Sequence, residues 1–172
     1  MIEPPHGPLG RDLDALAASL ARDLSEVRAG LIEALDGVSE LWLQRMLRGD
    51  LAREGWTVQH EAARHAADDA LLVAMLEHAA RGIEGWSATE ARRLRGEAMH
   101  VVQRARLAPL REHLAASGER AAEALQAHAA HLDRPFAVGD IASRAIVEVL
   151  RAQAERARAR AGVDAVRATF QR

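Results

Sequence analysis

The chain has 172 residues, no cysteine and a formal net charge of −2 at pH 7. This length suffices for one domain with a continuous core, and the lack of cysteine excludes thiol nucleophiles, iron–sulfur clusters and cysteine-based zinc sites. The charge supplies no general attraction to nucleic acid or to an anionic membrane, so we expect neither partner.

Residues 1–10, MIEPPHGPLG, precede the first helical pattern and are expected to form a flexible segment. They lack the cationic stretch followed by apolar residues that a secretory signal requires. The sequence also has no run of about 18 apolar residues, the length that crosses a membrane. We therefore expect a cytoplasmic protein.

Apolar residues recur at gaps of three and four from Leu13 to Leu35, which predicts one stripe of a long amphipathic helix. The pair Asp36-Gly37, followed by Ser39, predicts that this helix stops and that another one starts. The second segment carries its apolar residues between Val38 and Leu47 and ends at Gly49.

Two further helices begin at residues suited to cap a first turn. A third helix is predicted from Thr57, whose hydroxyl can accept a bond from an exposed amide, to about Gly82. A fourth is predicted from Ser87, because Ser87 and Glu90 three residues later match the capping-box pattern.

The last third of the chain is divided by proline, glycine and a capping aspartate. Pro109 lacks the amide hydrogen of an interior helical bond, so it kinks the fourth helix or opens a new one that ends at Gly118. Residues 119–132 form another helix. The final long helix is predicted to be capped by Asp140 and to extend to Gly162.

These elements predict an all-α, single-domain bundle of about six to seven helices over residues 11–162, with residues 163–172 as a short C-terminal helix or tail. No segment alternates between apolar and polar residues over the length of a strand, so we assign no strands. Much of the apolar content is alanine, so the core contains few large apolar side chains. Such a core on long helices predicts exposed apolar stripes that a partner would cover.

Two tryptophans stand in similar surroundings. Trp56 and Trp86 each follow a Glu-Gly pair and each precede the residue that starts a predicted helix. The structural interpretation is a hydrophobic staple, in which the ring folds over the first turn. The functional alternative is that the two rings line a shared ligand pocket.

Histidines and glutamates at helical spacing raise the possibility of a metal site. Glu97 and His100 form a Glu-x-x-His pair, the unit that di-iron carboxylate bundles use twice. Glu61 and His65, four residues apart, offer a second pair with a different spacing. Since the twofold pattern is incomplete, we predict no cofactor and keep a metal ion or haem held by these four residues as the alternative.

The segment Arg95-Gly-Glu-Ala-Met-His100 resembles the catalytic motif of the helical HEPN-type ribonucleases over its six residues. In that family the arginine and histidine contact the RNA backbone around the scissile phosphate. The resemblance therefore implies this catalytic role for Arg95 and His100.

The pattern as a whole favours a non-enzymatic protein. Long amphipathic helices, alanine-rich faces and the lack of a recognisable catalytic set indicate a regulatory, sensor or protein-interaction module of a bacterial-type signalling system. We expect it to bind a second copy or another protein through its amphipathic helices. The alternatives are a metal- or haem-binding bundle and a HEPN-like ribonuclease.

Overall fold

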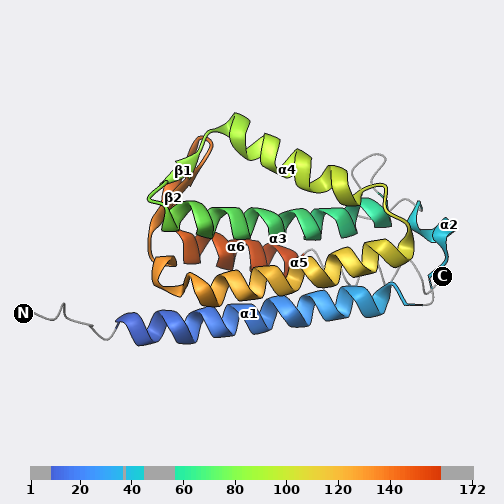
Figure 1. Ribbon diagram of the computed structural model, residues 1–172, viewed down its shortest axis with the longest axis horizontal. Coiled ribbons are helices and arrows are strands. Elements are labelled where there is room, and N and C mark those ends of the chain that lie inside the picture. The colour runs from blue at the N-terminus through green and yellow to red at the C-terminus, as the bar shows by residue number, and fades with distance from the viewer. Residues whose placement is uncertain (1–8, 37, 45–56, 160–172) are drawn as a thin grey trace, which may run out of the picture.

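In the computed structural model of the protein, residues 9–36, 38–44 and 57–159 are described (Figure 1). Five helices of 14 residues or more make up most of this part of the chain. The predicted helical, single-domain character is confirmed, whereas the predicted number of six to seven helices is not matched. The long helices are α1 (Leu9–Ala34), α3 (Val58–Ala80), α4 (Ala88–Val102), α5 (Leu107–Ala127) and α6 (Ile146–Ala159). The shorter helical segments are α2 (Glu40–Leu43) and the 3₁₀ turn η1 (Ala129–His131).

Successive long helices run in opposite directions and lie along one another, and the bundle is elongated along their common direction (Figure 1). α1 packs against α5, α5 packs against α3, and α4 lies on the outer side of α3. α3 is the central helix, and it buries side chains around most of its circumference. α4 has a single fully buried residue, Val102. No helix of the described ranges is both long enough and apolar enough to cross a membrane.

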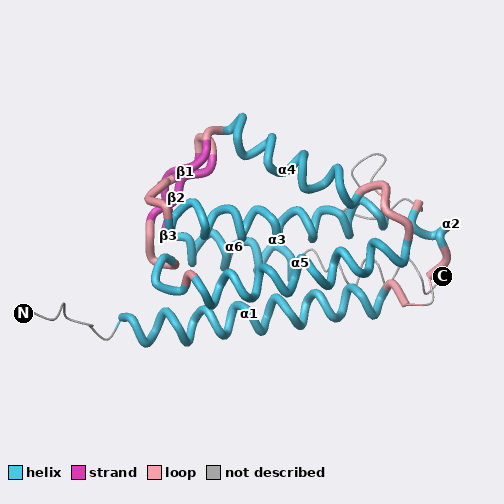
Figure 2. Tube along the Cα trace, viewed as in Figure 1, coloured by secondary structure: helices cyan, strands magenta, loops and turns pink. Residues whose placement is uncertain are grey.

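A small sheet at one end of the bundle shows that the prediction of no strands was wrong (Figure 2). Its strands β1 (Gly85–Trp86), β2 (Pro135–Val138) and β3 (Ile141–Ala145) lie in that order, with β1 parallel to β2 and β2 antiparallel to β3. The strands are short, and four of the five residues of β3 are exposed, so an alternating apolar pattern never develops.

The predicted cap at Asp140 was also wrong. Gly139, with a φ of +64°, and Asp140 form the two-residue connection between β2 and β3. Glycine adopts this left-handed conformation without steric cost, which is why such pairs favour hairpins. The final helix therefore begins at Ile146, after the hairpin, instead of directly after Asp140.

The predicted starts of two helices are confirmed. Thr57 Oγ1 accepts a hydrogen bond from the His60 amide at 3.3 Å and caps α3. Ser87 Oγ accepts one from the Glu90 amide at 3.1 Å and caps α4. Each bond satisfies an amide that has no partner within its own helix.

The prediction of a helix end at Gly118 was wrong, because α5 continues through it to Ala127. Pro109 lies in the first turn of α5, where its missing amide hydrogen costs no helical bond. A Cβ atom on Gly118 would stand 2.9 Å from Arg28 Cγ. This glycine therefore lets α1 and α5 approach each other and does not terminate a helix.

Two apolar clusters form the core, and a polar layer separates them. The cluster nearer the sheet contains Leu76, Leu125 and Phe136, and the other cluster contains Leu31 and Leu110. Between them along the helices lie three buried polar residues, one each from α1, α3 and α5: Arg28, Asp69 and Ser117.

Candidate functional site

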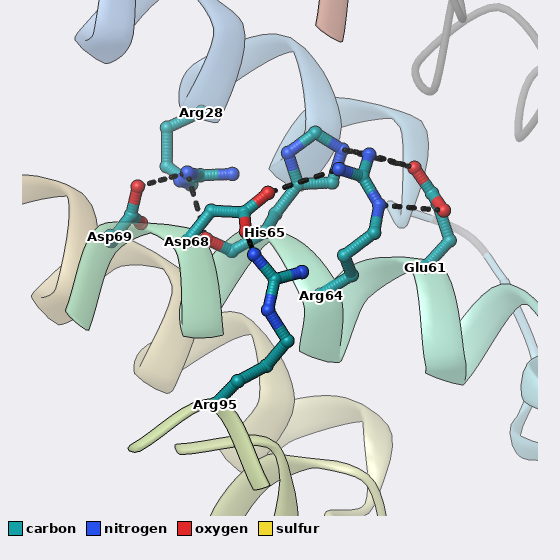
Figure 3. Close-up of polar contacts among 7 residues, drawn as sticks. All are labelled: Arg28, Glu61, Arg64, His65, Asp68, Asp69 and Arg95. Atoms are coloured by element: carbon teal, nitrogen blue, oxygen red, sulfur yellow. Dashed lines mark hydrogen bonds and ion pairs between the residues drawn. The ribbon is translucent and has the colours of Figure 1, made fainter. Parts of the chain in front are cut away.

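The buried polar layer joins three helices through charged and hydroxyl groups, and Figure 3 shows its charged residues on α1 and α3. Arg28 is 4% exposed and Asp69 is 2% exposed. Arg28 Nη2 pairs with Asp69 Oδ1, and it donates to the His65 carbonyl at 3.3 Å. Ser117 Oγ donates to Asp69 Oδ2 at 2.8 Å. Asp69 therefore holds α1 and α5 against the central helix.

A second group of charged residues continues along the same side of α3 (Figure 3). Arg64 donates to both carboxylate oxygens of Glu61, at 2.5 and 3.2 Å, and to Asp68 at 3.0 Å. Arg95 of α4 approaches the other oxygen of Asp68 at 3.2 Å. Asp68 thus connects the outer helix to α3, which completes a polar network of residues from four helices.

Burial, hydrogen bonds and neighbouring charges together set the protonation states within this network. Burial alone would raise the pKa of the Glu61 carboxyl, but hydrogen bonds from His65 and Arg64 together lower that pKa far below its ordinary value. Burial lowers the pKa of His65, and the charges of Arg28 and Arg64 lower it further, so the ring is neutral at pH 7. A neutral imidazole still donates one N–H, here to Glu61 Oε1 at 3.4 Å.

Asp69 and Arg28 are less completely compensated. Burial raises the pKa of the Asp69 carboxyl, while the charge of Arg28 and the Ser117 hydrogen bond oppose this rise. Arg28 Nε and Nη1 are buried and have no hydrogen-bond partner among the described residues. The layer is therefore costly to bury, although its main ion pair is formed.

The structure brings together two of the four residues considered as metal ligands. Glu61 and His65 are neighbours on α3. Glu97 and His100 lie on the exposed side of α4, where Glu97 accepts from Arg93 at 2.7 Å. Within the described ranges, no group of three or more histidine, aspartate or glutamate side chains is placed to hold a metal ion.

The other candidate residues that the structure describes lie on α4 and in the small sheet. Arg95 is engaged by Asp68, and His100 lies on the exposed surface of the same helix. Trp86 is buried, packs edge-to-face on Phe136 and donates from Nε1 to His78 Nδ1 at 2.7 Å. Trp56 lies outside the described residues, so the shared pocket between the two tryptophans stays untested.

A pocket of about 350 Å³ opens between α3, α4 and α5, and we call it the α3/α4/α5 pocket. Its walls are mostly alanine and valine, and its polar lining residues are Glu77, His113, Ser117 and Arg120. The residues on α5 follow the spacing i, i+4, i+7, which is one face of a helix. Ser117 therefore belongs both to the pocket and to the buried polar layer.

Sequence reasoning missed the polar layer. Arg28 lies four residues after Leu24 and three before Leu31, so it occupies the apolar stripe of α1. That position was the available signal, because a charged residue in the middle of an apolar stripe needs a buried partner.

Comparisons with known proteins identify no relative. No protein-family model matches the chain, and neither the curated proteins nor the solved structures include a significant match. A function for this chain therefore rests on the geometry of its own residues.

Proposed function

We propose that the protein is a non-enzymatic sensor or regulatory module of a bacterial-type signalling system, and that the α3/α4/α5 pocket binds the small molecule that it senses. One observation carries the proposal. Ser117 lines the pocket and also donates to Asp69, which is paired with Arg28 of α1. A ligand that contacts Ser117 thus acts directly on the bond that ties α1 to the centre of the bundle.

The position of α4 supports a responsive pocket. α4 contributes Ala98, Val101 and Val102 to the lining. Its ion pair with α3 is the contact between Arg95 and Asp68, and both side chains are partly exposed. Partly exposed ion pairs are weak, so an occupant of the pocket can change the spacing between α4 and α3 at low cost.

The polar network itself favours a coupling role over catalysis. The single hydroxyl proton of Ser117 has two acceptors within reach, Asp69 and the Leu114 carbonyl at 3.1 Å, and Asp69 faces Arg28. The Ser117 hydroxyl and the Asp69 carboxylate are thus engaged inside the bundle instead of being presented to the pocket as a free nucleophile or base. We propose that the change at α1 then passes to a second copy or to a partner protein through the amphipathic helices.

Binding of 1-anilinonaphthalene-8-sulfonate, an apolar fluorescent anion, tests the pocket. The expected result is saturable binding to the wild-type protein that weakens about tenfold in Ala70→Phe, because the new ring fills the pocket. Ala18→Phe is the matched control, since Ala18 is an exposed alanine in the middle of α1. An absence of saturable binding, or equal binding to both variants, would overturn the proposal.

Amide NMR shifts test the coupling. Probe binding is expected to shift the amides around Arg28, because Ser117 and Asp69 connect them to the pocket. Ser117→Ala should keep the binding and lose these α1 shifts. If the α1 shifts persist unchanged in Ser117→Ala, the coupling does not pass through the polar layer.

A further inference from the structure

Two opposite charges line the α3/α4/α5 pocket without neutralising each other. Glu77 lies on α3 and Arg120 lies on α5, and both belong to the lining. Neither forms an ion pair within the described ranges of the chain. By contrast, Arg93 pairs with both Glu90 and Glu97 at 2.7 Å on the neighbouring α4.

The rest of the lining is mostly apolar and small. Ala66, Ala70, Val73 and Ala74 follow one another along the α3 wall. This wall suits a compact hydrocarbon body, because alanine leaves space for it and presents no polar atom from its side chain. At about 350 Å³ the pocket is near the lower end of ligand-site volumes, so it suits a small molecule.

The local field at Glu77 has the same sign as its charge. Glu77 lies in the last turn of α3, which ends at Ala80, and the carbonyl groups there add negative potential. This end of the pocket therefore favours a cation. The planar guanidinium of Arg120 presents paired donors that match a carboxylate.

We infer that the ligand is a zwitterion with an apolar body, in the class of apolar amino acids and their short peptides. Its ammonium group binds Glu77, its carboxylate binds Arg120, and its side chain packs on the alanine wall of α3. This inference rests on the proposed function, because it names the chemistry of the ligand that the same pocket senses.

Three probes with one carbon skeleton test the inference by isothermal titration calorimetry. L-Phenylalanine carries both charges, 3-phenylpropanoate lacks the ammonium group, and 2-phenylethylamine lacks the carboxylate. Glu77 and Arg120 are exposed, and an exposed ion pair contributes up to about 1 kcal/mol, so phenylalanine is expected to bind about fivefold more tightly than either analogue.

Substitutions assign each end of the ligand. Arg120→Gln should weaken phenylalanine binding about fivefold and leave binding of the amine unchanged, whereas Glu77→Gln should weaken phenylalanine binding and leave binding of the acid unchanged or tighter. Arg92→Gln and Glu119→Gln are the matched controls, since both residues are exposed and lie outside the lining.

The outcomes separate the two proposals. The zwitterion assignment is overturned if the acid or the amine binds as tightly as phenylalanine, or if Arg120→Gln and Glu77→Gln act like the controls. If Ala70→Phe still weakens binding of the naphthalene sulfonate in that case, the proposal of a sensing pocket stands, and its ligand is an acid or an amine. If that binding is also missing, the proposed function fails as well.

Discussion

Removal of the Asp69 carboxylate should destabilise the protein more than most single substitutions. Asp69→Ala leaves Arg28 as a buried cation, and the remaining acceptor for its Nη2 atom is the His65 carbonyl at 3.3 Å. Its Nε and Nη1 atoms already lack partners among the described residues. Breaking a buried pair in this way costs about 3–5 kcal/mol, because the abandoned charge stays desolvated.

Urea unfolding followed by far-ultraviolet circular dichroism measures this loss. With a slope of about 2 kcal/mol per molar urea, the unfolding midpoint should fall by about 2 M. The double variant Arg28→Met with Asp69→Leu is the control, because it keeps the volume and removes both charges. It should match or exceed the wild-type stability, since Ser117 keeps the Leu114 carbonyl as its acceptor at 3.1 Å. A loss below about 1 kcal/mol for Asp69→Ala would refute the reasoning.

Glycine substitutions and pH give two further predictions. Gly118→Ala should lower the free energy of unfolding by about 1–3 kcal/mol, because its Cβ would stand 2.9 Å from Arg28 Cγ. Gly96→Ala, with nothing within 4 Å of the new Cβ, should raise the free energy of unfolding by about 1 kcal/mol. An equal rise of the thermal unfolding midpoint in both variants would contradict the close packing of Gly118 against Arg28. Burial lowers the pKa of His65 from 6.5, so below that pH the unfolded chain binds a proton that the folded chain does not. Stability should then fall by up to about 1.4 kcal/mol per pH unit, and His65→Gln should flatten this fall in urea midpoints measured from pH 7 to about 5; parallel curves for the two proteins would exclude His65 as the cause.

The sequence was most informative where a structure depends on neighbouring residues alone. The caps at Thr57 and Ser87 were predictable because a side-chain oxygen and an amide three residues later decide them. The long apolar stripe of α1 was predictable for the same reason. Gly118 misled because its role depends on Arg28, which lies 90 residues away in the sequence and close in space.

The strands and the polar layer depend on which segments meet. β2 gains its partners from Gly85–Trp86 and from Ile141–Ala145, and the first of these is remote in the sequence. Glu61 and His65 are neighbours because their spacing on one helix fixes their relative position, whereas their prediction as metal ligands stays untested. The sequence alone could not predict whether Glu97 faces α3, because this depends on which side of α4 packs against α3. Ala91 and Leu94 occupy the packed side, and Glu97 is exposed.

An ion pair in the core needs an explanation other than stability, because apolar residues of similar volume stabilise a core at least as well. Arg28 and Asp69 form directional contacts, which methionine and leucine cannot form. The two charged residues contact each other, Arg28 also contacts the His65 carbonyl, and Asp69 also contacts the Ser117 hydroxyl. A change at Ser117 therefore alters a defined bond to α1, whereas a change beside an apolar pair would be absorbed by small adjustments of packing. For this reason the loss of the α1 response in Ser117→Ala, with binding retained, is the observation that separates a sensing pocket from a cleft that a ligand merely occupies.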